Sequence, residues 1–428
     1  MGTNVEIHKL DNGLTILTKE MHHVPLVSQW VWYRVGSRNE PHGKSGISHW
    51  VEHMQFKGTP AYPINVLDKE ISRDGGIWNA MTSLDWTAYF ETMPAHKLDI
   101  ALQLEADRMR NSLFDVQETE LERTVVISER EGNENEPLFR LGEAVQKAAF
   151  QKHTYRHQVI GEMQDLKSIT RDDLYAYYRA HYTPNNALIA LAGDFHTAEV
   201  LDKYAHLYGD NHDRLTNKFI PQPEEKLPEP ARIEMKGPGN TVYLQLSYRS
   251  PCANSDDFFS LIVLDSLLTG PSSLSMFGSG GISNKTSRLY QVLVEKDLAV
   301  SVSAGVQATI DPYLYEILVI LQPNHSLERV LGIIDEEIIR LQSGGISEEE
   351  IRRAIRQAKA LFAYSSESIT NQAFWLGYAS MFASHEWFEN YLIRLEEVTP
   401  SMVSQTAQKY LHQQHRIVGI YQPKNNGK

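Results

Sequence analysis

The feature that most constrains the fold of this chain is an internal duplication. Thr170 opens a predicted helix that runs into the apolar segment 187–191, and Thr399, 229 positions later, opens one that runs into a similar segment at 416–420. Two helix-then-strand units at one fixed offset indicate that the same arrangement of elements occurs twice. A stretch rich in proline and charged residues at 210–231 separates the two halves, and such a composition is typical of extended, solvated chain.

The hydrophobic pattern predicts helices and strands throughout both halves. In the first half, strands are predicted over 14–17, 26–35, 87–92 and 188–191, and helices over 46–57, 94–111, 117–135 and 171–181. In the second half, strands are predicted over 242–248, 299–306 and 314–322, and helices over 256–268, 326–342, 348–365 and 400–411. The chain has 428 residues and 42% hydrophobic content, which is enough for two large cores. We therefore predict an α+β protein with two similar domains, 1–209 and 232–428, joined by a linker at 210–231.

The composition excludes several classes of function. A formal net charge of −13 argues against non-specific binding of nucleic acid. Cys252 is the only cysteine, so neither an intrachain disulfide nor a thiol-rich metal cluster is possible. No apolar run approaches about 18 residues, and the first residues lack the basic region and apolar core of an export signal. We expect no membrane span and a cytoplasmic location, with the periplasm left open should an export signal have been removed.

The strongest chemical signal is the pentapeptide HWVEH at 49–53. Residues at positions i, i+3 and i+4 share one face of a helix, so His49, Glu52 and His53 project together. Two imidazoles on one helical turn can bind one Zn²⁺, and the neighbouring carboxylate can accept a proton from an attacking water molecule. This pattern is the inverted zincin motif, H-x-x-E-H, although a pattern of five residues also arises by chance.

Further segments along most of the chain accompany this motif, at 11–14, 36–38, 75–83, 168–174, 182–186 and 193–194. With them, the chain resembles the pitrilysin/insulinase metallopeptidases, in particular the short bacterial members similar to mitochondrial processing peptidase. The resemblance implies two homologous α/β-sandwich domains that form a clamshell around a central cavity. It also implies a zinc-dependent endopeptidase that hydrolyses peptides or unfolded segments. The corresponding first helix of the second half, at 258–264, contains no histidine, so one Zn²⁺ per chain is expected, in the first domain.

Two glutamates on a predicted helix of the first half complete the expected site. Glu122 and Glu129 are seven positions apart and therefore project from one helix face. Glu129 lies 76 positions after His53, which matches the family's spacing for its third ligand, and two histidines with one carboxylate form a catalytic zinc set. Glu122 resembles the acid that orients this site. The resemblance thus implies the metal ligands His49, His53 and Glu129 and the catalytic residues Glu52 and Glu122.

Substrate binding is expected on one edge strand, because the family adds an extended peptide to the sheet at this position. Backbone hydrogen bonds then give affinity with little sequence preference. The expected residues are Trp78, Asn79, Ala80, Met81 and Thr82. For Asn79 the alternative is a turn residue that follows the glycine pair at 75–76. The glycine-rich segment 270–285 resembles an enlarged loop that contacts substrate in processing-type relatives, and it lacks the lysine pattern of a phosphate-binding loop.

One departure from the family lies in the second half. Active single-chain relatives carry an arginine and a tyrosine, seven positions apart, which follow a serine-arginine-leucine-aromatic segment and assist the substrate carbonyl. Here that segment is present at 287–290, but Val294 and Val300 stand at the two positions and one residue between them is missing. Loss of one such donor typically costs about 10²–10³ in turnover.

The missing pair indicates a heterodimer in which a homologous, metal-free subunit supplies the arginine and tyrosine. A self-sufficient homodimer that uses Arg288 or Tyr290 is the alternative. Two further alternatives come from other classes: a non-catalytic assembly subunit, and a zinc hydrolase that acts on non-peptide amides or esters.

Overall fold

The computed structural model describes residues 5–215, 219–224, 229–271, 284–323 and 325–424. The chain forms two compact units, each built from three segments of sequence. Unit 1 contains Met1–Gly132, His157–Gln222 and Ser366–His385, and unit 2 contains Asn133–Arg156, Pro223–Ser365 and Glu386–Lys428. The domain boundaries expected along the chain stay a prediction. Most of the loop expected to contact substrate, 272–283, lies outside the described residues.

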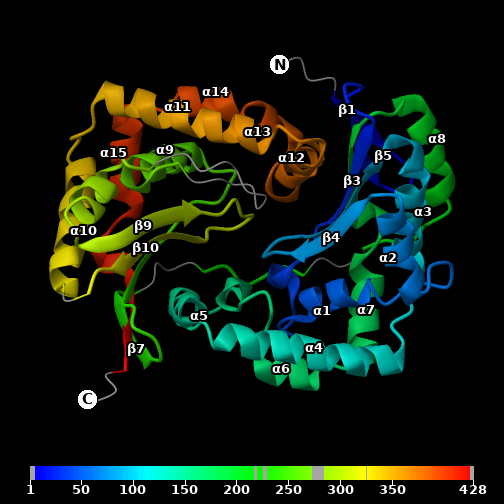
Figure 1. The fold of residues 1–428 in the computed structure, drawn as a ribbon, viewed down its shortest axis with the longest axis horizontal. Helices are drawn as coiled ribbons and strands as arrows, with labels where there is room; N and C mark the ends of the chain where they lie inside the picture. The colour runs from blue at the N-terminus through cyan, green and yellow to red at the C-terminus, as the bar shows by residue number, and fades with distance from the viewer. Residues whose placement is uncertain (1–4, 216–218, 225–228, 272–283, 324, 425–428) are drawn as a thin grey trace. The chain divides into compact units, whose positions relative to one another are not determined.

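Unit 1 contains a six-stranded mixed sheet in the order β1-β2-β6-β3-β5-β4. Figure 1 labels β1, β3, β4 and β5 of this sheet. Its strands are β1 (Val5–Lys9), β2 (Thr15–Glu20), β3 (Leu26–Tyr33), β4 (Ile77–Thr82), β5 (Thr87–Pro94) and β6 (Ala187–Gly193). Its helices are α1 (Ile47–Met54), α2 (Ile64–Arg73), α3 (Leu98–Asn111), α4 (Val116–Glu134, which ends just beyond the unit), α6 (Met163–Ser168), α7 (Arg171–His181), α8 (Thr197–Tyr208) and α12 (Ile369–Phe382). β2 and β6 are parallel, and the other neighbours are antiparallel.

Unit 2 contains a five-stranded sheet in the order β7-β11-β8-β10-β9. Its strands are β7 (Ala231–Gly237), β8 (Tyr243–Arg249), β9 (Ala299–Val306), β10 (Leu314–Leu321) and β11 (Ile417–Pro423). Its helices are α5 (Pro137–Ala149), α9 (Asp257–Thr269), α10 (Leu327–Gln342), α11 (Glu348–Ser365), α13 (His385–Glu389), α14 (Tyr391–Glu396) and α15 (Pro400–Tyr410). β7 and β11 are the parallel pair of this sheet. Every helix and strand predicted from the sequence is present, with its ends shifted by a few residues.

The two sheets share one topology, which confirms the duplication. The order β2-β6-β3-β5-β4 of unit 1 matches β7-β11-β8-β10-β9 of unit 2, and both place their single parallel pair first. Thr170 caps α7 by accepting a hydrogen bond from the backbone N–H of Asp173, and Thr399 caps α15 in the same way from Met402. α7 is followed by β6, and α15 by β11. At the start of each helix, the threonine oxygen satisfies an otherwise free backbone N–H.

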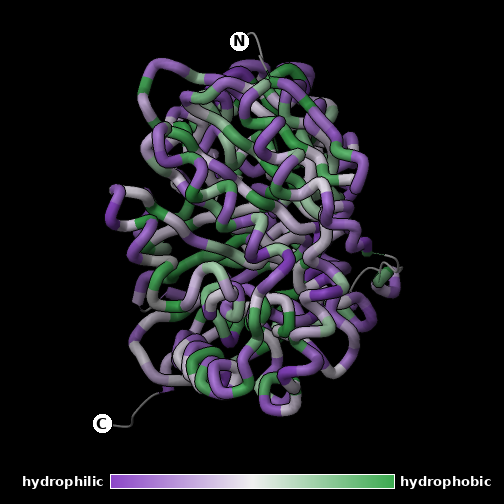
Figure 2. The backbone as a smooth tube through the Cα atoms, turned by 90° about the vertical axis from the view of Figure 1, so that its right-hand side faces the viewer, coloured by the Kyte–Doolittle hydropathy of each residue, from purple (hydrophilic) through white to green (hydrophobic). Residues whose placement is uncertain are grey.

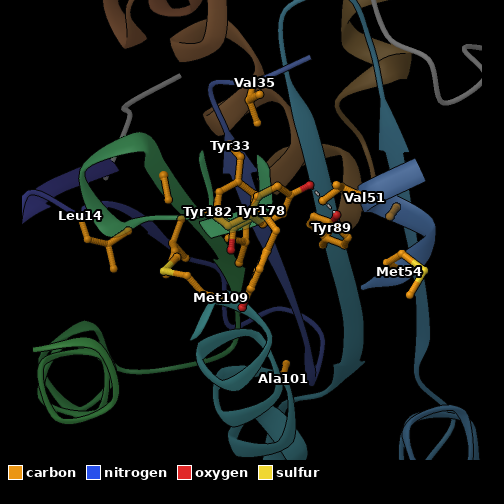
Figure 3. Close-up of a cluster of buried hydrophobic side chains, with 14 of the residues drawn as sticks. Leu14, Tyr33, Val35, Val51, Met54, Tyr89, Ala101, Met109, Tyr178 and Tyr182 are labelled. Carbon is orange, nitrogen blue, oxygen red and sulfur yellow. Dashed lines mark hydrogen bonds between the residues drawn. The ribbon is translucent and has the colours of Figure 1, made fainter. Parts of the chain in front are cut away.

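Strand β3 is buried on both faces of the unit 1 sheet. Successive side chains of a strand point to opposite faces. Val31 and Tyr33 therefore join the core cluster that includes Val51 and Met54 of α1, while Trp30 and Trp32 contact α12 on the other side. Figure 3 shows part of this core, including the 2.9 Å hydrogen bond between the hydroxyl groups of Tyr89 and Tyr182. α1 is thus attached to the sheet by apolar packing.

Each sheet is covered by a helix from the other half of the sequence. α12 packs against β3 and β6 in unit 1, and α5 packs against β11 in unit 2. Both contacts use a glycine at the point of closest approach. A Cβ on Gly377 would lie 2.1 Å from the indole nitrogen of Trp32, and one on Gly419 would lie 2.7 Å from a methyl group of Val145. Larger residues at these two positions would push the helices away from their sheets.

Among the helices that the structure describes, none is both long and apolar enough to cross a bilayer. In Figure 2, hydrophilic and hydrophobic stretches are interspersed along the coloured part of the chain.

Candidate metal centre

The helix that carries the motif begins at a tightly packed backbone position. Gly46 precedes α1 with φ +88°, and a Cβ on it would lie 2.5 Å from the carbonyl oxygen of Ile160. Only glycine combines this left-handed conformation with such a close approach. The carboxyl group of Glu40 accepts hydrogen bonds from the N–H groups of Gly46 (2.8 Å) and Ser48 (2.9 Å), and burial raises the pKa of Glu40 to about 8. These contacts fix the start of α1 and therefore the direction of its motif face.

Three potential ligand atoms meet beside α1, two from its own histidines and one from α4. Nε2 of His49 and Nε2 of His53 are 3.3 Å apart. Oε2 of Glu129, on α4, lies 3.6 Å from the His53 nitrogen and 3.9 Å from the His49 nitrogen. Ligand atoms at about 2.0–2.1 Å from a tetrahedral Zn²⁺ are roughly 3.3 Å apart, so these distances fit a zinc ion with little rearrangement. The structure thus brings together the three residues predicted as ligands.

The two histidines differ in their electrostatic surroundings. Burial lowers the pKa of His49 to about 3, which keeps its imidazole neutral and its ring nitrogen available to a metal. For His53, burial also favours the neutral ring, but its hydrogen bond to Glu122 and the nearby carboxylates outweigh burial and raise its pKa. A metal cation bound between the His49 and His53 rings would take the place of the extra proton that the neighbouring carboxylates favour on His53.

Glu122 orients the His53 ring through Nδ1, the nitrogen that does not face the other ligands. Its Oε1 lies 2.7 Å from Nδ1 of His53, and its other oxygen forms an ion pair with Lys57. Burial raises the pKa of Glu122, but the hydrogen bonds from His53 and Lys57 outweigh it and hold that pKa below its usual range. The charged carboxylate assigns the ring proton to Nδ1 and leaves Nε2 as the free ligand atom. Lys57 was missed at the sequence level, and its position four residues after His53 is the signal that would have suggested it.

Glu52 lies beside the ligands but is not one of them. Its side chain is buried, its Oε2 accepts a 2.5 Å hydrogen bond from the hydroxyl group of Thr82, and burial raises its pKa to about 7. A carboxylate held in this way can exchange protons near neutral pH. The contact restricts the rotation of the Glu52 side chain, a task for Thr82 that was not expected from the sequence.

The five residues expected to bind substrate all lie in strand β4, which also includes Ile77. β4 pairs with β5 on one side and is the last strand of the sheet among the described residues, which is the position where a peptide can add as a further strand. Asn79 is paired with Phe90 inside this strand, which excludes the alternative that it is a turn residue. Trp78 packs against Phe56, with ring centroids 4.8 Å apart, and is partly buried. α1 packs against β4, so the edge and the ligands belong to one continuous part of unit 1.

In unit 2, valines occupy the two positions where active relatives carry the arginine and tyrosine, and the nearby Arg288 is already hydrogen-bonded. Val294 ends a π-helical turn at Tyr290–Val294, and Val300 lies in β9 with 53% of its surface exposed. Arg288 donates hydrogen bonds to Glu350 (2.8 and 3.0 Å) and to the carbonyl oxygen of Gly345 (2.6 Å). Within the described part of unit 2, no three histidine, cysteine or acidic side chains meet in a metal-binding arrangement.

The chain has two units of one topology, and one of them places a carboxylate, the third ligand, beside an H-x-x-E-H helix. This combination defines the class of two-domain inverted zincins. A family model described as "Insulinase (Peptidase family M16)" matches residues 15–162, and one described as "Peptidase M16 inactive domain" matches residues 168–358. The chain therefore belongs to the insulinase family, peptidase family M16.

Individual relatives agree with this assignment. An uncharacterized zinc protease of Mycobacterium leprae is 27% identical over 421 residues, which are 97% of this chain and 92% of the relative. A mitochondrial-processing peptidase subunit beta of Lentinula edodes is 26% identical over 376 residues, 86% of this chain and 79% of the relative. The crystal structure of a protease from Helicobacter pylori superimposes with a TM-score of 0.88 at 26% identity and covers 98% of this chain and all of that one. Proteins named as a zinc protease and a processing peptidase subunit are thus similar to this chain over most of its length.

Proposed function

We propose that this protein is a zinc-dependent endopeptidase that hydrolyses extended peptides or unfolded segments. The observation that carries the proposal is the meeting of His49, His53 and Glu129, with donor atoms 3.3–3.9 Å apart, at the helix α1 that also carries the buried Glu52. The relatives named zinc proteases support the same reaction class.

The residues of the chain divide the chemistry among them. His49, His53 and Glu129 would hold the metal, which when bound acts as a Lewis acid on the scissile carbonyl and promotes ionisation of water. Glu52 accepts the proton of the attacking water and delivers it to the leaving amine. Thr82 keeps the Glu52 carboxylate in place, and Glu122 keeps the His53 ring in place.

Substrate would bind as an added strand beside β4, the last strand of the unit 1 sheet among the described residues. Backbone N–H and C=O groups of an extended peptide would pair with those of residues 78–82, which favours unfolded segments over folded proteins. Such backbone pairing depends little on the side chains of the peptide, so it gives affinity with little sequence specificity. Asn79 is exposed and Trp78 is partly buried, so both side chains of β4 can contribute some sequence preference.

We further propose that the chain is the metal-bearing subunit of a heterodimer. Val294 and Val300 have no polar group to offer a carbonyl, and the guanidinium group of Arg288 is already bound to Glu350 and Gly345. One relative is named as subunit beta of a processing peptidase, which supports division of the activity between chains. A homologous, metal-free partner would supply the arginine and tyrosine. The self-sufficient homodimer is the outcome that the experiment below separates from this one.

The test is hydrolysis of a mixed set of unstructured peptides by the purified chain, measured by mass spectrometry with zinc content determined in parallel. Wild type, Glu52→Gln and His49→Ala are compared, each with and without chelator. Glu52→Gln should keep its zinc and lose turnover, and His49→Ala should lose zinc. Strong cleavage by the chain alone would refute the heterodimer and favour the self-sufficient homodimer. Cleavage that persists in zinc-loaded Glu52→Gln would refute the proposed mechanism.

A further inference from the structure

A second cluster of histidine and carboxylate side chains lies in unit 1, away from the motif helix. Glu20 ends β2, His22 follows it, and His196 precedes α8. One potential ligand atom from each of these three residues lies within 4.8 Å of the other two. The parallel pairing of β2 and β6 produces this meeting, because Glu20 is in register with Gly193, three residues before His196.

The hydrogen bond at Nδ1 of His22 repeats the one at Nδ1 of His53. Nδ1 of His22 lies 2.7 Å from a carboxylate oxygen of Asp194, just as Nδ1 of His53 lies 2.7 Å from Glu122. Nε2 of His22 then faces Oε2 of Glu20 at 3.0 Å. A carboxylate that holds the ring proton on Nδ1 leaves Nε2 as a free ligand atom, which is the arrangement found behind metal-binding histidines.

The other members of the cluster are also held in place. Oε1 of Glu20 accepts a 2.6 Å hydrogen bond from the backbone N–H of Thr197, so Oε2 is the oxygen left to face His22. The rings of His22 and His196 have centroids 5.7 Å apart with a tilt of 42°, which places the second imidazole beside the first. Two imidazoles and one carboxylate form a donor set suited to Zn²⁺ and its neighbours among divalent transition metals.

We propose that Glu20, His22 and His196, oriented by Asp194, bind a second divalent transition-metal ion, with Zn²⁺ as the probe of choice. This site differs from the motif site in exposure: half of the His22 side chain is solvent-accessible (49%), against 14% for His49. Solvated ligands keep their water shell in the free state, so the second ion binds more weakly than the first. The site ties the end of β2 to the turn between β6 and α8 when it is filled.

The competing explanation is an ion pair in which a protonated His22 bridges Asp194 and Glu20 without any metal. The two explanations predict different zinc stoichiometries. The full-length protein, stripped of metal by chelator, is dialysed to equilibrium against graded Zn²⁺ at pH 7.5, and bound zinc is measured by elemental analysis. The proposal requires the wild type to bind one ion more per chain than a variant without His22 and His196 does, and equal numbers of bound ions in the two proteins would overturn it.

Variants locate the second ion. His22→Ala combined with His196→Ala should bind one ion, while His23→Ala, the adjacent exposed histidine, should still bind two. Asp194→Asn should keep two ions but weaken the second by about 10- to 100-fold, because it affects only the orientation of His22. His49→Ala removes the first ion independently, so failure of one site does not imply failure of the other. Retention of two ions after removal of both His22 and His196 would show that the second ion binds elsewhere.

Discussion

His53 and Glu122 are joined by a hydrogen bond of 2.7 Å between Nδ1 and Oε1, and this contact orients the ligand face of the proposed zinc centre. The two residues lie 69 positions apart in the sequence and come from α1 and α4. The second oxygen of Glu122 is held by Lys57. A chain of three charged or polar groups therefore fixes one imidazole, and the consequences of breaking it can be measured.

Replacement of Glu122 by Gln should weaken zinc binding by about 10- to 100-fold, because an amide holds the proton on Nδ1 less strongly than a carboxylate does. Lys57→Met should have a smaller effect in the same direction. Competition between the protein and a chelator of known affinity measures both. Glu120→Gln, an exposed glutamate of the same helix, is the matched control. An affinity equal to that of the wild type in Glu122→Gln would exclude the orienting task.

Thr82→Val should reduce turnover without loss of zinc. The valine has a similar shape but cannot donate the 2.5 Å hydrogen bond to Glu52. Hydrogen bonds to charged groups contribute about 1.5–3 kcal/mol, so kcat should fall about 10- to 100-fold. Steady-state kinetics separates this effect from substrate binding, because loss of a strand contact would raise KM instead. Ser83→Ala, the next residue along the chain, is the control that should leave kcat unchanged.

Gly46→Ala should destabilise unit 1 by about 3 kcal/mol or more, since it adds a Cβ both to a left-handed backbone and against the carbonyl group of Ile160. Gly43→Ala is a matched control, because Gly43 also has positive φ (+79°) but has no atom within 4 Å of its added Cβ. It should cost only about 1–2 kcal/mol. Urea unfolding followed by tryptophan fluorescence compares the two. Equal losses would show that the approach to Ile160 has no energetic consequence.

Glu40→Gln should change the pH dependence of stability. The pKa of Glu40 is raised by burial to about 8 in the folded protein, against a usual value of 4.5. The folded state therefore holds a proton that the unfolded state has lost between these pH values, and stability falls as pH rises through this window. Glutamine stays neutral and has no such loss.

The melting temperature of Glu40→Gln relative to that of the wild type should therefore increase between pH 5 and pH 8. The exposed Glu199→Gln, measured beside it, should show no such trend. A wild type that becomes the more stable protein at pH 8 would mean that the N–H groups of Gly46 and Ser48 hold Glu40 as an anion.

Short-range spacing in the sequence determined much of this protein. The 3.6-residue period of a helix places His49, Glu52 and His53 on one face, and the seven-residue interval places Glu122 and Glu129 together, whatever surrounds them. The duplication was readable for the same reason, because each half repeats a local order of helix and strand. The threonine caps at Thr170 and Thr399 are equally local.

Contacts between distant segments were decided by the tertiary structure alone. Thr82 meets Glu52 because β4 packs on α1, and His22 meets Asp194, 172 positions away, because β2 and β6 pair in parallel. Helices α5 and α12 cover the sheet of the other half, which no local pattern announces. Such contacts depend on how whole elements bury their apolar faces together, and that choice is made by packing over the entire unit, which a short stretch of sequence does not contain.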